Sequence, residues 1–299
     1  MAIKLGVAPI AWSNDDLPEL GGDTPLDVCL RESHEAGYSG TESGGKFPLD
    51  ASVLGPLLSQ YDLQLVSGWF SGRLLELSVA EEIQRMEQQL STFAALGAPV
   101  MVYAETSGSV QGQRTTPLSQ RPRLAPEDYA AYGAKLTAVA EHMAARGVPM
   151  AYHHHMGTII ETEAEIDALM AHTGPAVGLL IDTGHLTFAG GDVLATTHRY
   201  GARINHVHCK DIRPAVLQRV REQDMSFLDG VLAGVFTVPG DGHIDFNAFA
   251  QALAEIAYRG WAVVEAEQDP AQANPLQYAR LGYTHLHQAL TAAGLTIAK

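Results

Sequence analysis

Four short apolar runs in the second half of the chain each end in side chains that bind divalent metals. These runs are MAYHHH at 150–155, VGLLID at 177–182, INHVHCKD at 204–211 and WAVVEAE at 261–267. Side chains of a strand alternate between its two faces, so residues two positions apart point the same way. Such pairs are His153 with His155, His206 with His208, His208 with Lys210, and Glu265 with Glu267. Imidazole and carboxylate together suit Mn²⁺, Co²⁺, Fe²⁺ or Zn²⁺ better than Ca²⁺ or Mg²⁺.

Glycines that recur before apolar segments indicate how these runs are positioned. Six times a helical pattern meets a glycine and then an extended apolar segment; the glycines are Gly37, Gly97, Gly147, Gly174, Gly201 and Gly260. Each is expected to be a helix C-cap that leads into a strand. One helix shows its buried face in residues three and four apart: Tyr129, Tyr132, Leu136, Val139 and Met143.

The opening IKLGVAPI and the segment LQLVSGWF after Asp62 raise the number of expected strands to eight. Eight strands that alternate with helices over 299 residues predict one α/β domain, a (β/α)₈ TIM barrel spanning residues 1–299. In such barrels the active site lies at the carboxyl ends of the strands, where the metal-binding candidates fall. The alternative, an open doubly wound sheet, would need a glycine-rich loop after the first strand, but AWSNDD follows Ile10.

Composition excludes several classes of protein. The formal net charge of −15 and the lack of a Lys/Arg cluster argue against a nucleic-acid partner. No apolar run is long enough to span a membrane, and the N-terminus turns acidic too soon for a signal peptide, so we expect a cytoplasmic protein. Cys29 and Cys209 give no disulfide framework, and Cys209 is expected to face the helices as a buried thiol.

Two stretches interrupt the alternation of strands and helices. Residues 106–125 are polar and contain two prolines, and residues 211–245 are expected to hold one short helix before a loop. Loops of this length in a barrel usually cover a binding site. Both are candidates for lids over a ligand or for contacts within a homo-oligomer.

Five segments together resemble one family. They are GVAPIAWSNDD, YHHHMGT, IDTGH, HVHCKD and GVFTVPGDGHIDF. The chain resembles, over essentially its whole length, the inosose dehydratases, which act on 2-keto-myo-inositol. IDTGH and HxHxKD alone are less specific, because they resemble the wider superfamily of metal-dependent sugar isomerases, epimerases and AP endonucleases. The resemblance implies a lyase that removes water from a cyclic polyol ketone to give a trihydroxycyclohexane-dione, with Mn²⁺ or Co²⁺ and with glutathione.

The resemblance also implies a metal site. The superfamily typically takes Glu, Asp, His and Glu from strands five to eight, which matches Asp182, His208 and Glu265 here. Strand five has no glutamate, and His153 takes its place. His155 then falls where related dehydratases place a catalytic base. The missing glutamate argues against an epimerase. By the same resemblance, ketose epimerases of the superfamily use the glutamates of strands five and eight for proton transfer.

The chemistry can also be argued from the residues. Dehydration of a β-hydroxy ketone needs a base for the α-proton, an acid for the leaving hydroxide and stabilisation of an enolate, which a chelated cation provides. His155 is the candidate base, because a neutral imidazole is competent near pH 7. Lys210 is a candidate for stabilising enolate charge or protonating the leaving group, and His185, three residues after Asp182, is a further polar candidate.

Other polar and aromatic residues near strand ends are candidates for contacts with the substrate. These are Trp12, Asn14, Glu42, Trp69, Glu105, Arg213 and Glu267. Each has a structural alternative: Trp12 suits the core equally well, and Glu105 could merely begin a loop. Asp182 could be a helix N-cap, and Asp211 is expected to pair with Lys210 or Arg213.

Four functional classes follow from this pattern. The first is the lyase, and the second is a sugar isomerase or epimerase that uses the same metal and enolisation. The third is a DNA-repair nuclease of the same barrel, which would need a basic face. A sugar-binding barrel without catalysis would need neither the metal nor an adjacent base.

Overall fold

Eight parallel strands close into a barrel in the computed structural model, which describes residues 2–298. The strands are β1 (Ala2–Val7), β2 (Gly40–Ser43), β3 (Gln64–Gly72), β4 (Met101–Glu105), β5 (Met150–His153), β6 (Val177–Asp182), β7 (Ile204–Cys209) and β10 (Gly260–Val264). Consecutive strands are neighbours, and β10 pairs back onto β1 through the register Ile3↔Gly260 to Val7↔Val264. The fold is therefore the predicted TIM barrel.

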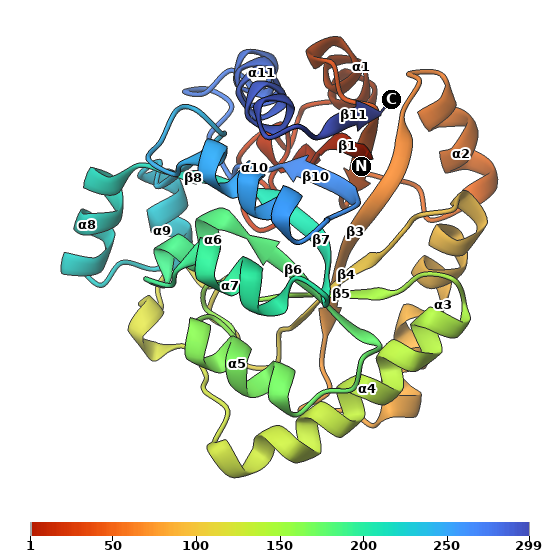
Figure 1. Ribbon diagram of the computed structural model, residues 1–299, viewed down its shortest axis with the longest axis vertical. Coiled ribbons are helices and arrows are strands. Elements are labelled where there is room, and N and C mark those ends of the chain that lie inside the picture. Colours follow the sequence, from red (N-terminus) through yellow and green to blue (C-terminus); the bar gives the residue numbers. More distant parts are fainter. Residues whose placement is uncertain (1, 299) are drawn as a thin grey trace.

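Helices surround the barrel on all sides (Figure 1). They are α1 (Leu26–Ala36), α2 (Ala51–Ser59), α3 (Val79–Leu96), α4 (Tyr129–Ala145), α5 (Glu163–Ala171), α6 (Thr183–Phe188), α7 (Val193–Tyr200), α10 (Phe246–Glu255) and α11 (Pro275–Ala292). Short 3₁₀ turns lie at η1 (Pro9–Ala11), η2 (Leu118–Gln120) and η3 (Pro126–Asp128). The face of α4 that was read from its spacing is buried at every position, from Tyr129 to Met143.

Glycine marks the helix ends less often than the sequence suggested. Three glycines have the left-handed conformation after a helix, namely Gly37, Gly97 and Gly147. Gly201 ends α7 in a right-handed conformation, and Gly174 lies in a turn, where its N–H donates to Thr137 Oγ1. Gly260 begins β10 and caps no helix. The strands were placed correctly even where the expected helix C-cap was wrong, because the strands are defined by the apolar runs that follow the glycines.

A small apolar cluster lies inside the barrel. Val66, Val263 and Trp261 form a small cluster inside the strands, separate from the main core between strands and helices. Gly40 leaves room for the indole, because a Cβ there would lie 2.6 Å from the Trp261 ring. Cys209 belongs to the main core that includes the helices, as expected for a buried thiol.

A layer over one end of the barrel is more structured than the sequence indicated. Residues 211–237 contain β8 (Asp211–Ile212), α8 (Pro214–Glu222), α9 (Phe227–Leu232) and β9 (Phe236–Thr237), where only one short helix was expected. The loop 106–125 packs against them: Leu118 N–H donates to Met225 O, and Ser119 Oγ donates to Asp224 Oδ2 at 2.6 Å. We call residues 106–125 and 211–237 the cap.

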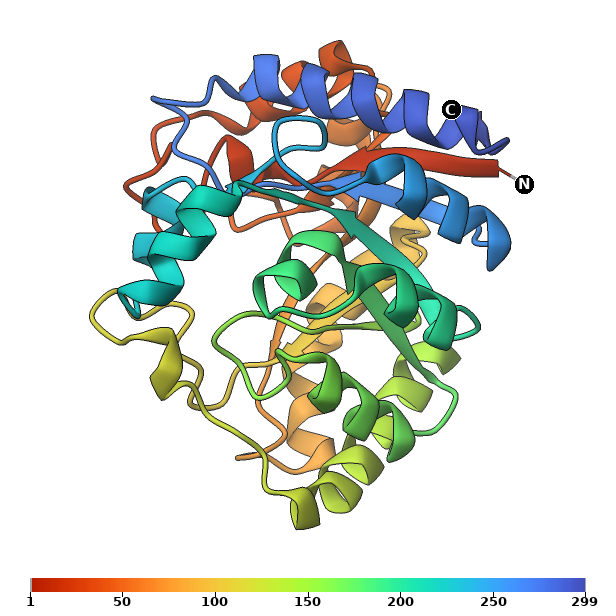
Figure 2. The same ribbon diagram turned by 60° about the vertical axis from the view of Figure 1, so that its left-hand side comes forward.

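The cap has a small apolar core, which includes Phe227, Val231 and Phe236 and also takes in residues outside the cap such as Leu17 and Phe188. It lies at one end of the barrel, with both chain termini at the opposite end (Figure 2). Beside the N-terminus, the additional strand β11 (Thr296–Ala298), which the sequence analysis did not predict, pairs with Ala2–Lys4 of β1. The cap thus covers the carboxyl ends of the strands.

Candidate functional site

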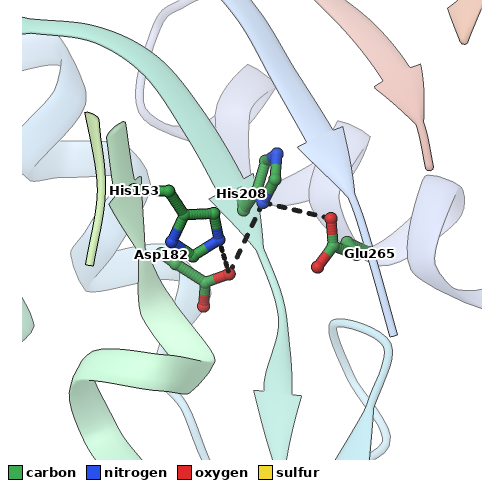
Figure 3. Close-up of side chains that lie close together, drawn as sticks. All are labelled: His153, Asp182, His208 and Glu265. Atoms are coloured by element: carbon green, nitrogen blue, oxygen red, sulfur yellow. Dashed lines mark ion pairs between the residues drawn. The ribbon is translucent and has the colours of Figure 1, made fainter. Parts of the chain in front are cut away.

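Four side chains that could hold a metal ion converge at the carboxyl end of the barrel (Figure 3). His153 ends β5, Asp182 ends β6, His208 lies in β7, and Glu265 directly follows β10. Asp182 Oδ2 lies 3.6 Å from His153 Nε2 and 3.5 Å from His208 Nδ1. Glu265 Oε2 lies 3.1 Å from His208 Nδ1. One ligand atom from each residue lies within 4.8 Å of the others, and all four side chains are buried. We call these residues the four-residue cluster.

Two atoms of this cluster show that it fits a cation. Asp182 Oδ2 and His208 Nδ1 are buried and, among the described residues, have no hydrogen-bond partner. Leaving such atoms unpaired is costly unless a bound group satisfies them. Asp182 Oδ1 is occupied, because it accepts the N–H of His185 at 2.8 Å as the N-cap of α6. Asp182 therefore combines the helix-cap role with a free oxygen, and the donor set suits a divalent metal ion.

Glu42 orients one member of the cluster. Its Oε1 lies 3.1 Å from His208 Nε2 and 2.8 Å from His206 Nε2, and Ser67 Oγ donates to the same oxygen. Burial raises the pKa of Glu42, but His208 and the hydrogen bond from His206 outweigh it and lower the pKa well below the usual range. With Nε2 directed at this carboxylate, Nδ1 of His208 faces the cluster. This is the arrangement by which a carboxylate fixes a metal-binding histidine.

A second group of side chains surrounds Lys210 beside the cluster. The Lys210 Nζ lies 2.6 Å from Glu265 Oε1, 2.7 Å from Glu267 Oε2 and 3.0 Å from His185 Nε2. Burial lowers the pKa of this ammonium, but the Glu265, Glu267 and Asp182 carboxylates raise it above its ordinary value. Lys210 is fully buried, and these carboxylates keep it as a fixed positive charge.

His155 lies next to this group but not on a strand. Because β5 ends at His153, His155 lies beyond the strand, but both histidine side chains point into the same pocket, as expected. The His155 backbone instead turns to bond Ile160, and its ring lies 4.0 Å from that of His185 and 5.3 Å from that of His153, centroid to centroid. Burial, and next the Lys210 ammonium, lower the pKa of His155 to about 4. The imidazole is therefore neutral at pH 7, as a base must be.

A pocket opens onto both groups. Among the predicted residues, those that line it are Glu42, Trp69, His153, His155, His208, Glu265 and Glu267. Trp69 places its ring edge-on to His153 and His155, at centroid distances of 5.7 and 5.4 Å. Lys210 and His185 lie behind the lining residues.

Four polar lining residues were missed by the sequence analysis, one of them Ser43 at the end of β2. Asp15 and Asp16 line the pocket, and their place just after the first strand was a usable signal. Gln111 comes from the cap, and its buried Oε1 has no hydrogen-bond partner within the part of the chain that the structure describes. Nothing in the spacing of a long loop singles out such a glutamine.

Two predicted substrate contacts near the N-terminus prove to be structural. Trp12 is buried, and its Nε1 donates to Glu32 Oε2 at 2.7 Å. The Asn14 side chain accepts the N–H groups of Asp16 and Leu17, which shapes the turn that presents Asp15 and Asp16. Neither side chain lines the pocket.

Glu105 and Arg213 are also corrected. Glu105 accepts the backbone N–H groups of Leu74 and Ser107, so it fixes the loops after β3 and β4. Arg213 bonds Asp241 at 2.6 Å and the Gly234 carbonyl at 2.8 Å, away from the pocket.

Asp211 is structural as expected, but with different partners. Its two carboxylate oxygens accept backbone N–H groups of Gly240, Gly242, His243 and Ile244, as well as that of Ile212. It therefore holds the loop before α10 and pairs with neither Lys210 nor Arg213.

Fold and cluster together define the class of protein. A family model described as the xylose isomerase-like TIM barrel matches residues 30–289. The solved structure of the IolI protein with a bound zinc atom covers 97% of this chain and 99% of its own, with a TM-score of 0.69 and 18% identity. At that identity, the likeness shows the shared fold.

Curated relatives narrow the family. The rhizopine catabolism protein MocC of Rhizobium meliloti is 52% identical over 99% of this chain and 91% of its own length. The inosose dehydratase of Geobacillus thermodenitrificans is 46% identical over 93% of this chain and 94% of its own. The chain belongs to the inosose dehydratase family of xylose isomerase-like TIM barrels.

Among the described residues, no helix has the length and apolar character needed to cross a membrane.

Proposed function

We propose that this protein is a metal-dependent hydro-lyase that converts 2-keto-myo-inositol to a trihydroxycyclohexane-1,2-dione in inositol catabolism. The inosose dehydratases at 46% and 40% identity support this activity. The observation that carries the proposal is His155, a neutral imidazole that lines the pocket beside the four-residue cluster without belonging to it.

His153, Asp182, His208 and Glu265 would hold the divalent metal. When bound, such an ion polarises the ketone and stabilises negative charge on its oxygen. The mixed histidine and carboxylate donors suit Mn²⁺ or Co²⁺, which we propose as the working metals. Glutathione is proposed from the family resemblance, and its test is whether turnover by metal-loaded protein depends on added glutathione.

The residues beside the cluster then perform the proton transfer. His155 Nδ1 faces the Met156 carbonyl at 2.8 Å, and if it donates to that oxygen, Nε2 is left as the atom that accepts the α-proton. Trp69 packs against the ring and shields it from water. Lys210, held by Glu265 and Glu267, supplies fixed positive charge next to the developing enolate, and its raised pKa favours this role over proton donation. The proton that His155 accepts from the α-carbon then passes to the β-hydroxyl, which leaves as water.

Around the ring of the substrate, hydroxyl groups need hydrogen-bond partners. Asp15, Asp16 and Gln111 line the pocket, and the unpaired Gln111 Oε1 is available to accept a hydroxyl proton. We propose these three side chains as the substrate contacts, together with Glu42, Trp69 and Glu267.

The test is an assay with defined metal content. Protein stripped of metal and reloaded with Mn²⁺ or Co²⁺ is incubated with 2-keto-myo-inositol while the absorbance of the enolised dione is followed. We expect absorbance to rise with the metal-loaded protein and to stay flat with the stripped protein. Equal rates in both samples would contradict the metal dependence.

A further inference from the structure

The Lys210 ammonium lies where metal-binding groups converge. Besides its contacts with Glu265, Glu267 and His185, its Nζ is 3.7 Å from Asp182 Oδ2. Three carboxylates and one imidazole therefore surround a single nitrogen that is completely buried. Such a set of donors is typical of a divalent-cation site rather than of one lysine side chain.

The surrounding groups are arranged as a second set of ligands. His155, His185 and Glu267 each offer a ligand atom, and these atoms lie within 4.8 Å of one another. Glu267 Oε2 lies 2.7 Å from Nζ, so the two groups form a close ion pair. The ammonium acts on Glu267 as a point charge.

The chain makes room for this lysine. A Cβ at Gly184 would lie 2.6 Å from Lys210 Cγ, so the glycine of the IDTGH segment lets the aliphatic stem pass. The neighbouring Thr183 Oγ1 donates to the Lys210 carbonyl at 2.6 Å and accepts the Lys210 N–H at 3.0 Å. The end of β6 is thus shaped around a buried cationic side chain from the residue after β7.

Charge balance explains why an ammonium lies among these carboxylates. Asp182, Glu265 and Glu267 carry three negative charges, which one divalent ion and one ammonium neutralise together. Asp182 and Glu265 each contribute to the four-residue cluster and also contact Nζ. Carboxylates shared in this way bridge the two ions of two-metal sites, where the ions are about 3.5–4 Å apart.

We propose that Lys210 takes the place of a second divalent cation and thereby keeps the centre mononuclear. The proposal rests on the metal site of the proposed function. It predicts that removing the ammonium, while keeping the stem volume, turns the centre into one that binds two metal ions, with His185 and Glu267 as ligands of the second.

Mn²⁺ is the probe for this test. Wild-type protein and Lys210→Met are loaded with Mn²⁺ and freed of excess ion, and Mn per folded chain is measured by mass spectrometry and by electron paramagnetic resonance. We expect one uncoupled Mn²⁺ in the wild type and two spin-coupled ions in Lys210→Met. Lys210→Arg, which keeps the charge, and Lys210→Met/Glu267→Gln, which removes a ligand, should each hold one.

Lys210→Met leaves buried carboxylates without their cation, so its melting temperature in chelator should fall below that of the wild type and recover as Mn²⁺ is added. Folded Lys210→Met with one Mn²⁺ and a wild-type spectrum would overturn the proposal. A spin-coupled pair in the wild type at high Mn²⁺ would overturn it without any variant. A wild type that retains no Mn²⁺ would remove the metal site itself, and this proposal with it.

Discussion

At the scale of single residues, the site depends on side chains whose two polar atoms do different things. Asp182 caps α6 with Oδ1 and directs Oδ2 into the four-residue cluster. His208 faces Glu42 through Nε2 and faces the cluster through Nδ1. The alternatives that sequence analysis weighed for Asp182, a helix cap or a ligand, are therefore compatible.

The role of His155 predicts a separation between metal binding and turnover. His155→Gln should keep the metal, because His155 lies outside the four-residue cluster, and should lower kcat by about 10²–10⁴-fold, as expected for loss of a positioned base. Metal content and steady-state rates measure the two effects. Loss of metal together with activity would show that His153 and His155 have exchanged roles.

Glu42 predicts the opposite pattern. Glu42→Gln loses the charge that orients His208, so metal affinity should fall by about 10–100-fold, whereas His155→Gln keeps the metal. Competition with a chelating dye measures the affinity. Glu105→Gln is the matched control, because Glu105 bonds only backbone N–H groups away from the cluster and should leave metal affinity unchanged.

At the scale of elements, the periodic parts of the chain could be predicted and the cap could not. The eight barrel strands follow from apolar runs, and their ends place Asp182 and Glu265 correctly. The cap has strands of two residues and helices of six to nine residues, which are too short to show a hydrophobic periodicity in the sequence. It is held by side-chain contacts between segments that are distant in the sequence. Arg213 was wrongly predicted to contact the substrate for the same reason. Its partner Asp241 follows the cap in the sequence, and the spacing of the residues does not reveal such a contact.

Asp211 predicts the cost of losing one such long-range contact. Asp211→Ala removes the acceptor for four backbone N–H groups at 240–244, so we expect the free energy of unfolding to fall by about 3–5 kcal/mol. Chemical denaturation measures this change. Asp241→Asn, whose partner Arg213 is partly exposed, should cost at most about 1 kcal/mol. Equal losses in the two variants would contradict the structural role given to Asp211.

At the scale of the whole molecule, the metal should also act as a structural clamp. The four-residue cluster joins β5, β6, β7 and the end of β10, so an ion bound there by the native state alone stabilises the closed barrel. At a free metal concentration 100 times Kd, this stabilisation is about 2.7 kcal/mol.

Chelation should therefore lower the melting temperature, which calorimetry measures directly. Asp182→Ala should show a low melting temperature that no longer responds to added Mn²⁺, because the cluster is incomplete. A variant that is stabilised by Mn²⁺ as strongly as the wild type would place the ion elsewhere.

The central claim is that this barrel removes water from its substrate rather than inverting a carbon centre. An epimerase returns the α-proton on the opposite face, whereas a dehydratase expels the β-hydroxyl. Glu267 is ion-paired to Lys210, and Glu265 belongs to the four-residue cluster, so we assign neither of them to the second proton transfer of an epimerase.

The most direct measurement is mass spectrometry of the products formed from 2-keto-myo-inositol by metal-loaded protein in deuterated solvent. We predict a dione that has lost one water, with no inverted substrate in the remaining pool. Inverted ketose as the main product, with no dione, would contradict the account.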